Sequence, residues 1–191
     1  MTLSALGIFS AAGAGGAAFS SDYELIETQI LGSSQASVVF SSLGTYSSTY
    51  KHLQIRAVPR SDRADTDDVL FARVNGDTGS SYMYHLLFGD GASVSSSAAG
   101  IGAEKMELGR VAGGSNASGI YGQNVIDVLD AFSATKYKTF RSLAGLNRAT
   151  TPYVILYSGV RFNTASISSI SLFSQGNLVA GSRFSLYGIK G

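Results

Sequence analysis

Residues 36–61 read ASVVFSSLGTYSSTYKHLQIRAVPRS, and two segments of this stretch alternate between apolar and polar side chains. Val38 and Phe40 share one face of the first segment. Leu53 and Ile55 share one face of the second, with Arg56 among the polar residues of the other face. Side chains alternate across a β-strand with a period of two, so this pattern predicts half-buried β-sheet rather than helix.

The rest of the chain repeats this pattern in short segments separated by turn residues, and it ends on another alternating segment, SRFSLYGIKG. Many short strands with regular turns and only two prolines indicate an antiparallel β-sandwich, and we expect one of jelly-roll type. The expected strands are Tyr23–Leu31, Gln35–Ser41, Lys51–Val58, Val69–Asn75, Tyr82–Phe88, Glu104–Val111, Gln123–Asp130, Tyr137–Ala144, Tyr153–Phe162, Ser166–Ser174 and Arg183–Ile189.

Two local patterns carry more specific predictions. Asn75-Gly76 predicts a tight hairpin between Val69–Val74 and the strand that begins at Tyr82, with a positive φ at Gly76. Asn124–Ser133 has partly helical spacing, but its β-branched residues and the alternation that follows favour a strand. Residues expected in the core are Phe40, Leu53, Ile55, Phe71, Phe184 and Leu186.

The composition describes a weakly charged protein with a sizeable core. Hydrophobic residues make up 45% of the 191 residues and charged residues only 14%, below the roughly 25% of typical soluble domains. The polar surface therefore depends on residues such as serine, and it suits a protein covered by partners. The net charge of +1 gives no support for electrostatic binding to nucleic acid or to an anionic membrane.

The first residues, MTLSALGIFSAAGAGGAAF, differ from the remainder of the chain. They lack the basic residues of a secretory signal, and their apolar run is too short and too rich in glycine for a membrane helix. We expect residues 1–21 to form an extended attachment arm that binds a partner chain, followed by one sandwich domain over residues 22–191. The large side chains available for this contact are Leu3, Leu6, Ile8, Phe9 and Phe19.

Little in the sequence indicates catalysis, and we expect neither enzymatic activity nor a cofactor. The chain has no cysteine, and His52 and His85 do not lie in a metal-binding spacing. The motif GxSxG of serine hydrolases is absent.

The densest group of charges is the loop over residues 60–68. Asp65, Asp67 and Asp68 are weak candidates for a Ca²⁺ site, because closely spaced carboxylates can bind this ion. The loop lacks the twelve-residue calcium pattern, and nearby arginines can neutralise the same carboxylates. We therefore favour internal ion pairs, and the arginines available for them are Arg60, Arg63 and Arg73.

Several segments resemble structural proteins of tailed bacteriophages. The resemblance covers most of the chain after residue 21. It rests on the sequences of strands and turns rather than on catalytic motifs. Proteins of this class are tail-fibre, minor tail or head-decoration proteins. The segments are YELIET at 23–28, ASVVFSS at 36–42, YKHLQIR at 50–56, RVNGDTG at 73–79 and SRFSLYGI at 182–189.

This resemblance implies a component of the virion. Our first expectation is a cement or decoration protein on the capsid exterior, a homotrimer bound to the major capsid protein or other virion proteins. The alternative is a tail-fibre or spike protein that binds host surface glycans. A glycan-cleaving enzyme would need paired carboxylates, which the spacing of the candidates does not provide; they are Asp90, Glu104, Glu107, Asp127 and Asp130.

Overall fold

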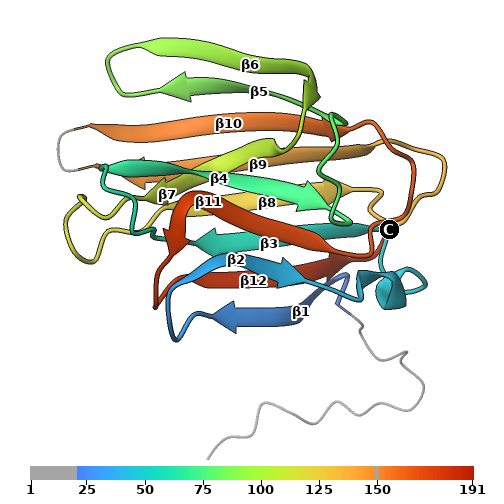
Figure 1. The fold of residues 1–191 in the computed structure, drawn as a ribbon. Coiled ribbons are helices and arrows are strands. Elements are labelled where there is room, and N and C mark those ends of the chain that lie inside the picture. The colour runs from blue at the N-terminus through green and yellow to red at the C-terminus, as the bar shows by residue number, and fades with distance from the viewer. Residues whose placement is uncertain (1–20, 149–150) are drawn as a thin grey trace, which may run out of the picture.

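The computed structural model describes residues 21–148 and 151–191, which form two antiparallel β-sheets packed face to face (Figure 1). The expectation of an all-β, sandwich-like fold is confirmed. The large sheet has, in spatial order, β1 (Tyr23–Ile30), β12 (Arg183–Ile189), β3 (His52–Val58), β8 (Gln123–Leu129), β9 (Lys138–Asn147), β10 (Pro152–Arg161), β5 (Tyr82–Gly89) and β6 (Val94–Ala103). The small sheet has β2 (Gln35–Phe40), β11 (Ile170–Leu178), β4 (Asp67–Val74) and β7 (Met106–Ala112).

Four strand pairs are nested along the chain: β1 with β12, β2 with β11, β3 with β8, and β4 with β7. Successive pairs of this set fall alternately in the large and the small sheet. The remaining strands, β9, β10, β5 and β6, add to the large sheet beyond β8 (Figure 1). We call these four strands the extension. The large sheet is therefore twice as wide, in strands, as the small sheet that covers it.

The core lies between the two sheets and is made by the alternating residues of the opening stretch and their counterparts. All six residues expected in the interior are buried, five of them completely, and Phe71 is 6% exposed. Leu53 and Ile55 point inward from β3, while Arg56 of the same strand is exposed. The period of two in the sequence thus sets which face of each strand enters the core.

The strand prediction for residues 124–133 is confirmed by β8, which takes up the first part of this segment. Two elements were not expected from the sequence. One is β6, and the other is a short 3₁₀ turn at Leu43–Tyr46. No helix among the described residues is long and apolar enough to cross a membrane.

The turn at Asn75-Gly76 has the expected backbone but a different role. Both residues have positive φ, 55° and 66°, as a primed turn requires. The predicted hairpin is wrong, because β4 pairs with β11 and β7 whereas β5 belongs to the large sheet. The Asn75 side chain explains this: its Nδ2 donates to the Ser166 carbonyl oxygen, and its Oδ1 accepts from the Ser168 N–H. These bonds fix the turn to the β10–β11 connection, and the chain crosses from one sheet to the other.

Candidate functional site

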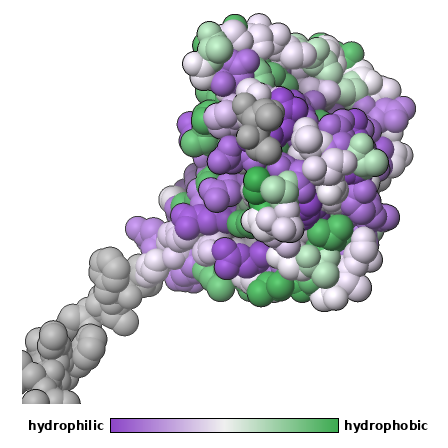
Figure 2. Space-filling view, turned by 90° about the vertical axis from the view of Figure 1, so that its left-hand side faces the viewer, coloured by the Kyte–Doolittle hydropathy of each residue, from purple (hydrophilic) through white to green (hydrophobic). Residues whose placement is uncertain are grey.

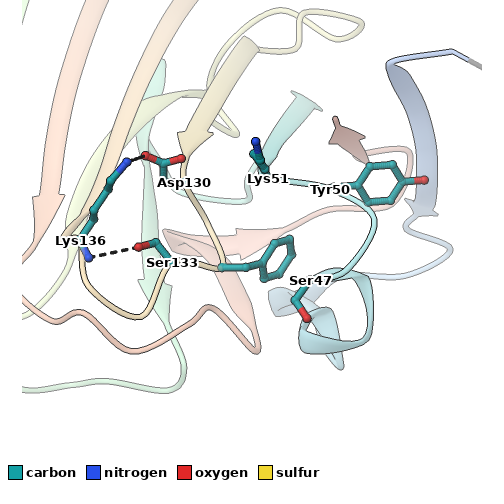
Figure 3. A pocket seen from close by; sticks show the side chains of 7 residues that line it. Ser47, Tyr50, Lys51, Asp130, Ser133 and Lys136 are labelled. Atoms are coloured by element: carbon teal, nitrogen blue, oxygen red, sulfur yellow. Dashed lines mark hydrogen bonds and ion pairs between the residues drawn. The ribbon is translucent and has the colours of Figure 1, made fainter. Parts of the chain in front are cut away.

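A hollow lies where the 3₁₀ turn meets the β8–β9 connection (Figure 3). Two of its charged residues, Asp130 and Lys136, are paired with each other. Lys136 Nζ lies 2.6 Å from Asp130 Oδ2, and this hydrogen bond holds the pKa of Asp130 below its ordinary value. The Asp130 N–H donates to His52 Nδ1 at 2.8 Å. The lining residues are Ser47, Tyr50, Lys51, Asp130, Phe132, Ser133 and Lys136.

Beneath the same connection, Lys138 is fully buried. Its Nζ donates to the carbonyl oxygens of Ser133, Lys136 and Thr164, and burial lowers the pKa of Lys138. Carbonyl groups from two connections thus converge on one ammonium group. The Asp130–Lys136 pair and the buried Lys138 therefore hold the loops in place. Asp130 is also a weak proton acceptor, because it is ionised and hydrogen-bonded.

The aspartates of the acidic loop have separate surroundings. Asp65 Oδ2 lies 3.4 Å from Arg63 Nη2, and Asp67 Oδ1 lies 3.0 Å from Arg148 Nη1. Asp68 is fully buried and accepts hydrogen bonds from the Ser61 hydroxyl and from backbone N–H groups. Within residues 21–148 and 151–191, no group of three His, Cys, Asp or Glu side chains is placed to hold a metal ion.

The other arginines near this loop have different partners. Arg60 donates to four carbonyl oxygens of the β7–β8 connection, and Arg73 lies over the Phe173 ring at 5.0 Å.

Figure 2 looks onto the end of the sandwich at the left of Figure 1, where hydrophilic and hydrophobic side chains are intermixed.

The two histidines lie far apart in the large sheet. His52 is on β3 and His85 is on β5, with β8, β9 and β10 between them. At the usual strand spacing this separation is about 19 Å. The carboxylates that a glycosidase would need are also dispersed: Asp90 caps the β5–β6 turn, Asp127 lies on the outer face of β8, and Glu107 is on β7.

The most distinctive surface is the outer face of the large sheet, the face turned away from the small sheet. Four exposed apolar side chains stand side by side across neighbouring strands, because Val125 opposes Leu143, Leu143 opposes Leu156, and Leu156 opposes Leu87. They are between 39% and 55% exposed. We call these four residues the outer row. Val154, two positions from Leu156 on β10, adds a fifth apolar side chain that is 63% exposed.

A second row on the same face is polar. Gln54 Nε2 donates to Asp127 Oδ1 at 2.8 Å, and Arg141 Nη2 donates to Asp127 Oδ2 at 3.0 Å. The Tyr23 hydroxyl donates to Gln54 Oε1, and its ring stacks on that of Tyr187 at 4.7 Å. The outer face therefore places an apolar strip beside a connected polar network.

The sequence contains a signal for the outer row that we did not use. Residues 153–157 read YVILY, an uninterrupted apolar run within β10. Such runs are typical of strands that are covered on both faces, as in the interior of layered folds. Ile155 and Tyr157 are buried against the core, whereas Val154 and Leu156 are exposed. In the isolated chain, one face of β10 is thus apolar without a cover among the described residues.

Comparisons with protein-family models, curated proteins and solved structures find no match to this chain. The arm residues expected to contact a partner, Leu3, Leu6, Ile8, Phe9 and Phe19, lie outside the described residues.

Proposed function

We propose that this chain is a non-enzymatic structural protein of a tailed-bacteriophage virion, a cement or decoration protein of the capsid exterior. The outer row is the observation that carries the proposal, since it gives a weakly charged sandwich an apolar face suited to a partner. The segments that resemble phage structural proteins name the class of particle. The arm over residues 1–21 is part of the same proposal.

The proposal includes the jelly-roll type of sandwich. Its support is the nested pairing of β1 with β12, β2 with β11, β3 with β8, and β4 with β7. A long antiparallel ribbon that rolls up gives this order, and jelly rolls recur in viral capsid proteins. The extension is then an addition to the eight-stranded roll, and it carries three of the four outer-row residues.

The energetics suit a protein that binds an assembled shell. Covering the exposed half of one leucine or valine side chain contributes roughly 1 kcal/mol. Four such side chains support a modest interface for a single copy. On a symmetric shell every contact repeats, and a protein that binds only the assembled state stabilises that state.

The test adds purified protein back to particles produced without its gene. Particle-bound copies are counted by quantitative mass spectrometry, and shell stability is measured by thermal release of DNA. We expect many copies per particle and a higher release temperature. The double variant Leu143→Ser/Leu156→Ser should bind at least tenfold more weakly, whereas Val39→Ser, at a position of the small sheet that is 43% exposed, should bind normally.

Equal binding of the double variant and the wild type would contradict the proposal. A count of only a few copies per particle, with no change in release temperature, would also contradict a cement role.

A receptor-binding tail protein is the second candidate, and the polar row favours it. Stacked Tyr23 and Tyr187 lie under Arg56, whose guanidinium is within 5.5 Å of both rings. Aromatic faces beside amide, carboxylate and guanidinium groups suit the apolar and hydroxyl faces of a sugar. This role predicts that purified protein adsorbs to host cells and that Arg56→Ala reduces adsorption, with no binding to capsids.

A further inference from the structure

The edge of the large sheet at β6 is open. Among the described residues no strand lies beyond β6, which forms the upper border of the molecule in Figure 1. Val94–Ala99 pairs with β5 residue for residue, and the irregularity follows at residues 100–102. In an antiparallel pair, alternate residues direct their N–H and C=O groups away from the partner strand. A regular run of six residues therefore offers unpaired backbone groups along this edge.

The two edges of the large sheet differ in their protection. Edge strands usually carry charges, prolines or bulges that block further pairing. At the opposite edge, β1 has a register shift between Leu25 and Glu27 and a second carboxylate at Glu24. The sequence of β6, VSSSAAGIGA, has no charge and no proline, and both Val94 and Ile101 are about three-quarters exposed, at 74% and 76%.

We propose that β6 pairs antiparallel with β6 of a second copy of this chain, about a two-fold axis, to form one continuous sheet. A two-fold interface places a surface patch against itself, so a charge near the axis would lie close to its own copy on the partner strand. The neutral β6 meets this condition, whereas β1 with its two glutamates does not. A closed trimer would instead join β6 to a different edge of each neighbour.

The pairing also extends the outer face. Side chains directly opposite each other in an antiparallel pair share a face of the sheet. A two-fold axis normal to the sheet therefore lies midway between the two strands, at a point where one residue opposes its own copy, and the outer faces of both copies lie on the same side. Ser96 opposes Leu87 of the outer row across β5 and β6. The outer rows of the two copies then flank the join, which unites two apolar strips on one surface.

Because the chain has no cysteine, single cysteine variants report the pairing directly. The scan comprises Ser95→Cys, Ser96→Cys, Ser97→Cys and Ala98→Cys, with Ser34→Cys in the exposed β1–β2 turn as control. The residue on the axis faces its own copy at about 4.5–5.5 Å between Cα atoms, within the range for a disulfide. We expect rapid disulfide-linked dimers at one position of the scan and none in the control.

Light scattering after size exclusion gives the second readout. The wild type should have twice the 19.9 kDa mass of one chain, Ser96→Lys should have the monomer mass, and Ser34→Lys should remain a dimer. Circular dichroism checks that each variant is folded. Leu143→Ser/Leu156→Ser should stay dimeric, so a failure of the capsid proposal is distinguishable from a failure of this one.

A monomeric wild type at the highest soluble concentration would overturn the proposal. A dimer that persists with Ser96→Lys, or that forms disulfides equally at all four scanned positions, would place the interface elsewhere and overturn it as well.

Discussion

At the scale of single residues, Asp77 and Arg161 join the β4–β5 connection to the end of β10. Arg161 is only 4% exposed, and its Nε and Nη2 both lie 3.0 Å from Asp77 Oδ2. Asp77 also accepts hydrogen bonds from the Gly79 N–H and the Ser81 hydroxyl. One carboxylate thus holds the turn closed and neutralises a buried guanidinium group.

We expect Asp77→Asn to lower the free energy of unfolding by about 3 kcal/mol at pH 7, because it leaves the buried Arg161 charge without its counterion. Urea denaturation measures the change. Asp22→Asn, an exposed aspartate at the start of the described chain, is the control and should cost less than about 0.5 kcal/mol. A cost for Asp77→Asn as small as that of the control would show that Arg161 does not depend on this carboxylate.

The same carboxylate predicts a pH dependence. Burial alone would raise the pKa of Asp77, but hydrogen bonds from Ser81, Gly79 and Arg161 outweigh burial and hold the pKa below the ordinary value of 3.8. A lowered folded-state pKa contributes stability that is complete above 3.8 and is lost as the pH falls through the folded-state value. Melting curves from pH 6 downward should therefore show a smaller acid loss in Asp77→Asn than in the wild type. Parallel acid losses in the two proteins would contradict this assignment.

At the scale of the elements, two leucines of equal size test the assignment of faces. Leu53 points into the core from β3 and is fully buried, whereas Leu143 points outward from β9 and is 55% exposed. Leu53→Ala should cost about 2–5 kcal/mol in the free energy of unfolding. Leu143→Ala should cost less than about 0.5 kcal/mol, as expected of a surface position. Chemical denaturation of both variants gives the comparison, and similar costs would mean that the outer face is structural.

The sequence predicts a strand well where apolar and polar side chains alternate. The inward residues of β3 and β12 were placed correctly because each strand has one face in the core. The segment VSSSAAGIGA has no such alternation, so β6 could not be recognised; its strand state depends on pairing with β5. The Asn75-Gly76 pair predicted the backbone angle at Gly76 but not that the next strand, β5, belongs to the other sheet. That choice depends on bonds between Asn75 and residues about 90 positions later.

Part of the candidate face, the outer face of the large sheet, can be predicted from the sequence. The run YVILY within β10 signals a strand with two apolar faces. The outer row itself needs the register of four strands, and none of its three pairings is fixed by a local turn signal that we identified. Val125 and Leu87 lie three strand pairings apart in the sheet, and they are also far apart in the sequence. A single sequence does not carry that register.

At the scale of the whole molecule, both sheets are built within residues 23–189. We therefore expect deletion of residues 1–19 to leave the melting temperature within a few degrees of the wild-type value. We also expect the truncated protein to lose its binding to particles, because the proposed arm supplies part of the contact. Unfolding of the truncated protein, or full occupancy of particles by it, would contradict the role assigned to the arm.

The fold separates the core from two surfaces. The inward faces of both sheets form the core. We propose that the outer row contacts the shell and that β6 pairs with a second copy. The extension carries most of the first surface and all of the second. In this account the additional strands, rather than a pocket, adapt the sandwich to assembly.

Electron cryo-microscopy of intact particles distinguishes a position on the capsid from a position in the tail. We expect density for this sandwich at repeated positions on the capsid exterior, with Leu143 and Leu156 of the outer row against a neighbouring protein. Density for the sandwich at a tail tip, or on the capsid with the outer row facing solvent, would contradict it.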